Sequence, residues 1–180
     1  MPPRVVVWRL WQSDHASVIA RADREGTWLR PTRVASALFP LVLTAHAAAT
    51  WAMTGLIWFV QVVHYPLFAA IGPAGFAAYH AAHSRLTTLV VGPLMLVEAA
   101  CGVWIVLERP TPAAWTGVAL LAVVWGATFV ISVPRHNLLA AGFDAAVIDS
   151  LVATNWIRTI AWTARAGLAA WFLARLTRAA

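Results

Sequence analysis

Charged residues are scarce in this chain. They make up 11% of its 180 residues, whereas a soluble domain usually carries about 25%. Hydrophobic residues make up 61%, and the mean hydropathy is +0.73. This composition excludes an ordinary soluble domain and indicates an integral membrane protein. The length leaves no room for a second sizeable domain.

Lysine is absent, and all thirteen basic residues are arginine, which we attribute to a GC-rich genome rather than to mechanism. The formal net charge of +6 favours contact with anionic headgroups of membrane lipids. No nucleic-acid partner is expected, because no recognition motif accompanies the charge. The single cysteine, Cys101, excludes an intrachain disulfide. Walker, Rossmann, zinc-protease and nucleophile-elbow motifs are also absent from the sequence, which excludes the common soluble chemistries.

Four long apolar stretches are present instead, each about long enough to cross a bilayer as a helix. They cover residues 34–63, 86–107, 113–133 and 151–176. The link between the second and third stretches is short enough to force an antiparallel hairpin. Pro93 is expected to kink the second helix, and Pro112 and Pro134 bound the third. The sequence therefore predicts an all-α, integral membrane four-helix bundle at 34–180.

Residues 1–33 are basic and differ from the rest of the chain. We expect a short amphipathic segment there that lies on the membrane surface. The alternatives are a disordered tail and a start codon assigned too early. Arginines are also concentrated near the C-terminus, so the positive-inside rule places both termini of this multi-pass protein in the cytoplasm. The expected location is the plasma membrane.

Glu98 lies about midway along the second apolar stretch, where a carboxylate costs about 2.5–3.5 kcal/mol. Arg165 lies at a similar depth in the fourth stretch, so we expect the two side chains to pair. The pair has two interpretations. It is a structural lock that fixes helix register, or a working site that binds a polar or anionic substrate or relays protons. In the second interpretation Asn155 and Arg158, which share a helix face with Arg165, extend the site.

Four histidines are expected at one membrane face, because the polar faces of the four helices should point inward. His64 ends the first stretch, His80 and His83 lie one helical turn apart before the second, and His136 follows the third. Imidazole binds copper, iron and zinc, so these four are candidate ligands of a transition metal. Glu98 lies about 22–27 Å deeper along the same helix, which argues against a di-iron carboxylate site.

Two alternatives remain for the histidines. One is haem held between His64 and His136. The other is a set of separate interfacial side chains that bond to the backbone or to lipid headgroups. His46 and His15 are assigned no role.

Two segments carry a resemblance to a known family. The first is Pro134-Arg-His-Asn137-Leu-Leu139, and the second is Asn155-Trp156-Ile-Arg158-Thr-Ile-Ala-Trp162-Thr-Ala-Arg165. Together they resemble the closing half of the anthrone-oxygenase-like family of small four-helix membrane proteins. That family shows a Pro-x-Asn-like turn after its third span and then a Trp- and Arg-rich fourth helix. The first half of the chain does not match the family. The resemblance implies an oxygenase or oxidoreductase that acts on an aromatic or other lipophilic molecule without an organic cofactor.

The leading hypothesis is an oxygenase-like membrane oxidoreductase whose site opens toward the outer leaflet. The four histidines would bind a metal ion or move protons, while Arg158, Arg165 and Glu98 would orient a polar group of a lipophilic substrate. The alternative is a non-catalytic membrane module, such as a transporter subunit or an assembly partner, in which the Glu98–Arg165 pair is structural. A third hypothesis is a scaffold whose buried charges only set the packing. The sequence leaves open whether the chain forms a homo-oligomer.

Overall fold

The computed structural model describes residues 33–179. All secondary structure in this range is helical, without strands. The chain divides into two compact units, Met1–Ser36 and Ala37–Ala180, and the description below concerns the second. The predicted surface segment at 1–33 lies almost wholly outside the described residues.

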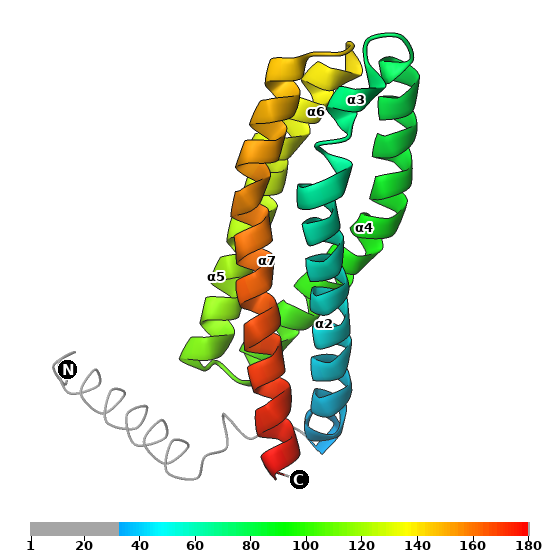
Figure 1. Ribbon diagram of the computed structural model, residues 1–180. Helices are drawn as coiled ribbons and strands as arrows, with labels where there is room; N and C mark the ends of the chain where they lie inside the picture. The colour runs from blue at the N-terminus through cyan, green and yellow to red at the C-terminus, as the bar shows by residue number, and fades with distance from the viewer. Residues whose placement is uncertain (1–32, 180) are drawn as a thin grey trace, which may run out of the picture. The chain divides into compact units, whose positions relative to one another are not determined.

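Four long helical rods make up the second unit. The helix α2 (Arg33–Phe59) continues into η1 (Val60–His64), and a short α3 (Phe68–Ile71) leads to α4 (Phe76–Glu108). After the hairpin, α5 (Pro112–Gly126), η2 (Ala127–Ser132) and α6 (Val133–Ala140) follow one another without a break, and α7 (Ala145–Ala179) completes the fold. Figure 1 shows these rods side by side, with the start of α2 and the end of α7 at the same end of the bundle. The predicted all-α four-helix bundle is confirmed.

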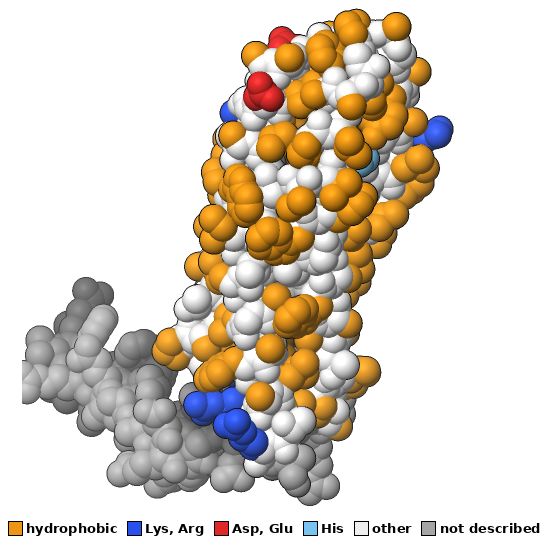
Figure 2. All heavy atoms as spheres, in the orientation of Figure 1, with side chains coloured by type: hydrophobic (Ala, Val, Ile, Leu, Met, Phe, Trp, Pro, Cys, Tyr) orange, Lys and Arg blue, Asp and Glu red, His pale blue; other side chains and the backbone are white. Residues whose placement is uncertain are grey.

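The surface of the bundle is that of a membrane protein. Three rods are long and apolar enough to cross a bilayer: Ala37–His64, Phe76–Glu108 and Pro112–Ala140. The fourth, α7, is just as long, but it carries more charged residues. Figure 2 shows hydrophobic side chains spread along the visible face, acidic side chains near the junction of α6 and α7, and cationic side chains toward both ends of the bundle. Large apolar side chains such as Leu107 and Val130 are exposed, as expected for a surface covered by lipid.

Two π-helical turns, η1 and η2, interrupt the rods just before prolines. η1 ends two residues before Pro66, and η2 ends two residues before Pro134. A proline ring collides with the carbonyl four residues earlier in an α-helix. A π turn inserts one residue and moves that carbonyl aside, so the helical segment can continue past the proline. The third span therefore runs to Ala140, beyond residue 133, where the sequence predicted its end.

The other predicted boundaries shift outward. α4 begins at Phe76, ahead of the apolar stretch at 86–107, because the residues from Phe76 are helical and run directly into that stretch, as expected. Pro93 lies inside α4, and Figure 1 shows that α4 bends part-way along its length. The α4–α5 hairpin ends at Thr111, whose hydroxyl accepts a hydrogen bond from the Ala114 N–H at 3.2 Å and caps α5. α7 begins at Ala145, where a short helical run from Asp144 was expected, and continues without a break through the apolar stretch at 151–176.

The interior of the bundle is layered along its length. Three apolar clusters contain Phe39, Leu43 and Ile105; then Met53, Met95 and Trp162; then Phe68, Phe76 and Leu151. Polar side chains that are buried or half-buried lie in the intervals between these clusters. We call the first interval the Glu98 layer (His46, Thr50, Glu98 and Arg165, with the indole of Trp162). We call the second the histidine layer (Gln61, His64, Tyr65, His80, His83, His136, Asn155 and Arg158).

Candidate functional site

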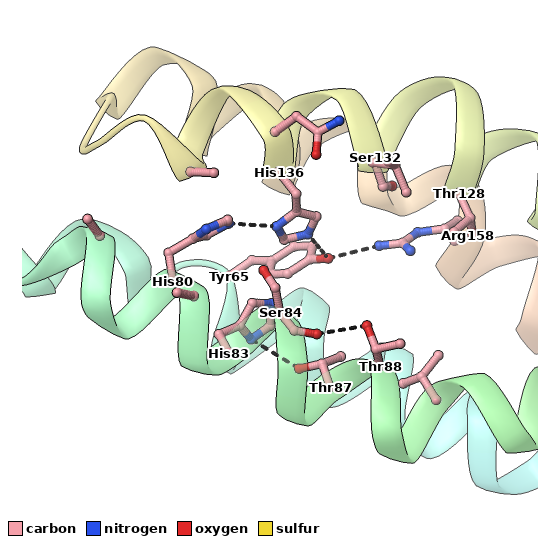
Figure 3. A pocket seen from close by; sticks show the side chains of 16 residues that line it. Tyr65, His80, His83, Ser84, Thr87, Thr88, Thr128, Ser132, His136 and Arg158 are labelled. Carbon is pink, nitrogen blue, oxygen red and sulfur yellow. Dashed lines mark hydrogen bonds between the residues drawn. The ribbon is translucent and has the colours of Figure 1, made fainter.

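The four predicted histidines converge in the histidine layer. Nε2 of His64 lies 2.7 Å from Nδ1 of His83, and Nε2 of His80 lies 3.0 Å from Nδ1 of His136. The ring centroids of His83 and His136 are 5.4 Å apart, which joins the two pairs. Figure 3 shows His80 and His83 rising from α4 toward His136 on α6. Imidazoles from three separate rods therefore meet at one place.

Tyr65 links the histidines to a cation. Its hydroxyl lies 2.9 Å from Nε2 of His136 and accepts a hydrogen bond from NH2 of Arg158 at 3.1 Å (Figure 3). Arg158 also donates from Nε to Oδ1 of Asn155 at 3.0 Å. Asn155 in turn donates to Oε1 of Gln61 at 2.9 Å. One hydrogen-bonded chain thus runs from His80 to Gln61.

The histidine layer opens into a cavity of about 450 Å³ between α4 and the η2–α6 segment. Its polar lining combines His80, His83 and His136 with the Arg158 guanidinium and several hydroxyl groups. The hydroxyl groups belong to Tyr65, Ser84, Thr87, Thr88, Thr128 and Ser132. The rest of the lining is mainly alanine and valine. The volume lies within the range of about 300–1,000 Å³ typical of small-molecule sites. Figure 3 shows these side chains projecting from both sides into the same space.

Both π turns lie beside this cavity. η1 carries Gln61 and His64 and is followed by Tyr65, while η2 carries Thr128 and Ser132. The inserted residue rotates the following turn of the rod, so it helps to set which way Tyr65 and His136 face. π turns inside α-helices are frequent at functional sites. The placement of these two supports a working role for the cavity.

The Glu98 layer is compact. Glu98 is completely buried, and its Oε1 accepts hydrogen bonds from Nε of Arg165 and from the Thr50 hydroxyl, both at 2.9 Å. The Trp162 indole donates to Oε2 at 3.0 Å. The predicted intramembrane ion pair is therefore present. Its carboxylate has three donors, so its charge is well compensated within the protein.

Arg165 also reaches His46, a residue to which the sequence assigned no role. NH2 of Arg165 lies 3.2 Å from Nε2 of His46, and NH1 donates to the carbonyl of Gly117. Nδ1 of His46 is buried and has no partner among the described residues. The adjoining space, lined by His46 and Arg165, measures about 20 Å³. It is large enough for one water molecule but not for a substrate.

The structure thus separates residues that the sequence grouped in one site. Asn155 and Arg158 lie with the histidines, whereas Glu98 and Arg165 lie in the other layer. An apolar cluster lies between the two layers; it consists of Met53, Ile57, Met95, Val124 and Trp162. Glu98 lies in a different layer from His64, His80, His83 and His136, as its position on α4 predicted. Tyr65 and Gln61 were not predicted as site residues; Tyr65 follows His64 directly, and only the π turn of η1 directs its hydroxyl inward.

The side chains of the histidine layer are of the type that binds transition metals. Neutral imidazole suits copper, iron and zinc. As arranged here, the histidines pair with each other, and the described residues include no group of three or more His, Cys, Asp or Glu in a metal-holding arrangement. The structure therefore shows buried histidines in a helical bundle.

Comparison with known proteins gives no match: no family model, no curated protein and no solved structure is similar to the chain. The resemblance to the anthrone-oxygenase-like family accordingly stays a prediction.

Proposed function

We propose that this protein is an oxygenase-like integral membrane oxidoreductase that acts on a lipophilic substrate at a transition-metal site. One observation carries the proposal: the imidazoles of His80, His83 and His136 line a cavity of small-molecule size. A fourth imidazole, that of His64, pairs with His83 beside the cavity. A copper, iron or zinc ion is the proposed cofactor. The resemblance of the 134–165 region to anthrone-oxygenase-like proteins points to the same reaction class.

The nitrogens that face each other are the proposed ligands. They are Nε2 of His64 and His80 and Nδ1 of His83 and His136. The second nitrogen of His136 bonds the Tyr65 hydroxyl. Metal-bound histidines almost always engage their other nitrogen in this way, which fixes the ring. A bound transition metal would supply a Lewis acid and, for copper or iron, a change of oxidation state.

The remaining residues of the cavity would position the substrate. Asn155 and Tyr65 hold the Arg158 guanidinium at the cavity wall. Alanine and valine on α4 and α6 supply an apolar surface for the rest of the molecule. We further propose that the cavity lies toward the outer leaflet of the plasma membrane, with both termini in the cytoplasm, since the arginines concentrated in residues 1–33 and near the C-terminus favour the cytoplasmic side.

Metal analysis of the purified full-length protein tests the proposal. The protein should carry an affinity tag without histidine and be reconstituted in phospholipid nanodiscs. We expect about one copper, iron or zinc ion per chain, lost in the His80→Ala/His83→Ala variant. His46→Gln serves as the matched control, because His46 lies in the other layer, and it should keep the metal. A wild-type protein that stays metal-free after incubation with all three ions would refute the metal site. A Soret absorption band would indicate haem instead.

A second candidate function rests on the Glu98 layer. Glu98 is saturated by three donors, and the space beside it is too small for a substrate. These features favour a structural ion pair, as in a non-catalytic module such as a transporter subunit or assembly partner. A metal-free, well-folded protein that copurifies with one stoichiometric membrane partner would support this candidate.

A further inference from the structure

The two buried arginines of α7 differ in how their charges are compensated. Arg165 pairs with Glu98 at 2.9 Å. Arg158 is 8% exposed and has no carboxylate within salt-bridge distance among the described residues. Its hydrogen-bond acceptors are the neutral Asn155 and Tyr65, and its NH1 has no partner in the described part of the chain. A buried cation without a counter-charge is costly, and it is most costly in a bilayer.

The same guanidinium borders the cavity. Among the described residues, Arg158 is the only arginine in the lining. Figure 3 shows it reaching the space from α7 through its bond to Tyr65. The hydroxyls of Thr128 and Ser132 line the same region. Because Asn155 and Tyr65 engage Nε and NH2, the two N–H groups of NH1 remain for a ligand.

From this arrangement we infer that Arg158 is a receptor for the carboxylate of a lipophilic acid, which the cavity takes up from the bilayer. One guanidinium balances one negative charge, so a singly charged head group fits better than a doubly charged phosphate monoester. The Thr128 hydroxyl already donates to the Val124 carbonyl at 2.8 Å, so the Ser132 hydroxyl is the donor inferred for the second carboxylate oxygen. The inference that a lipophilic carboxylate is the substrate rests on the proposed function. The inference that the cavity binds such a molecule does not.

The shape of the cavity explains how such a molecule would reach Arg158. The cavity lies between α4 and the η2–α6 segment, and several of its lining residues are exposed on the flanks of these rods. They are Ala77, Ala81 and Thr88 on α4, with Val133 and Ala140 on α6. Its mouth thus lies between two helices that are apolar enough to span a membrane. An acyl chain would lie along the alanine and valine surface while its head group turns inward.

Equilibrium binding of radiolabelled laurate tests the inference. The full-length protein is placed in nanodiscs of zwitterionic phosphatidylcholine, and dodecanol, which has the same chain without the charge, is measured in parallel. Laurate should bind the wild type at least about tenfold more tightly than dodecanol, because hydrogen bonds to charged groups are the stronger ones. Arg158→Gln should weaken laurate binding roughly tenfold to a hundredfold, and Arg158→Lys should weaken it less. Arg85→Gln removes an exposed arginine of α4 outside the cavity lining and should leave binding unchanged.

Equal affinity for laurate and dodecanol in the wild type would overturn the inference without requiring any variant. Unchanged laurate binding by Arg158→Gln would overturn it as well. Tighter binding of phosphatidylglycerol than of laurate would overturn the carboxylate assignment in favour of a resident phosphodiester lipid. Metal content is measured in the same samples. A metal-loaded protein that does not bind laurate refutes this inference alone, whereas a metal-free protein whose laurate binding needs Arg158 refutes the proposed metal site alone.

Discussion

The ion pair of the Glu98 layer allows a quantitative test of how the bundle is held together. Glu98 and Arg165 are 0% and 2% exposed, and Nε of Arg165 lies 2.9 Å from Oε1 of Glu98. Replacing one partner of such a pair leaves an uncompensated buried charge and costs about 3–5 kcal/mol. Replacing both removes both charges, so much of that cost should be recovered.

The two single variants should not be equally damaging. After Arg165→Gln, Glu98 still accepts hydrogen bonds from Thr50 and Trp162, so we expect the free energy of unfolding to fall by about 3 kcal/mol. After Glu98→Gln, Arg165 retains only the neutral acceptors His46 and Gly117. We therefore expect a loss nearer 5 kcal/mol. The double variant should be no less stable than Arg165→Gln alone, which gives a coupling energy of about 5 kcal/mol or more.

Unfolding of the full-length protein by increasing dodecyl sulfate in mixed micelles, followed by circular dichroism, measures these differences. Arg178→Gln removes an exposed cation from the last turn of the same helix and should leave the transition in place. Stability losses that simply add in the double variant would show that the two side chains are not coupled, and our account of the Glu98 layer would be wrong. If the variants fold but lose bound metal or laurate, the layer supports the cavity as well as the fold.

Two further substitutions probe the packing and the cavity wall. A methyl group added at Gly102 would lie 3.7 Å from Nε2 of His46, an ordinary contact, so Gly102→Ala should raise the free energy of unfolding by about 0.5–1 kcal/mol; a clear loss of stability in the same assay would contradict the described helix contact. Tyr65→Phe removes the hydroxyl between His136 and Arg158 and should lower the free energy of unfolding by about 1–3 kcal/mol. A variant as stable as the wild type would show that the hydrogen bonds of the Tyr65 hydroxyl do not stabilise the bundle.

Helix content and the inward placement of polar residues followed from the sequence because both are local. Apolar stretches of bilayer length predict helices, and side chains repeated every three or four residues share one face. The pairing of Glu98 with Arg165 could be predicted because the two lie at matching depths in their stretches, where an unpaired charge is costly. The convergence of His64, His80 and His83 with His136 followed from helix order and hairpin direction.

The helix ends near the prolines could not be predicted in the same way. Pro134 was expected to end the third span, because proline disrupts an ordinary α-helix. The π turn of η2 carries the rod on to Ala140 instead. A one-residue insertion leaves no mark in hydropathy, but it turns every later side chain of the rod, and so it decides what His136 and Tyr65 contact.

What the sequence alone determined is the class of molecule: a helical membrane bundle with polar faces inside, one buried ion pair, and four histidines that lie near one another toward one end. What only the tertiary structure decided is which polar residues act together. Arg158 and Arg165 are seven residues apart on one helix, and nothing local distinguishes them. In the folded bundle Arg165 contacts Glu98 of α4, whereas Arg158 borders an open cavity. The difference depends on the tertiary structure, because a buried charge is compensated by contacts with other helices.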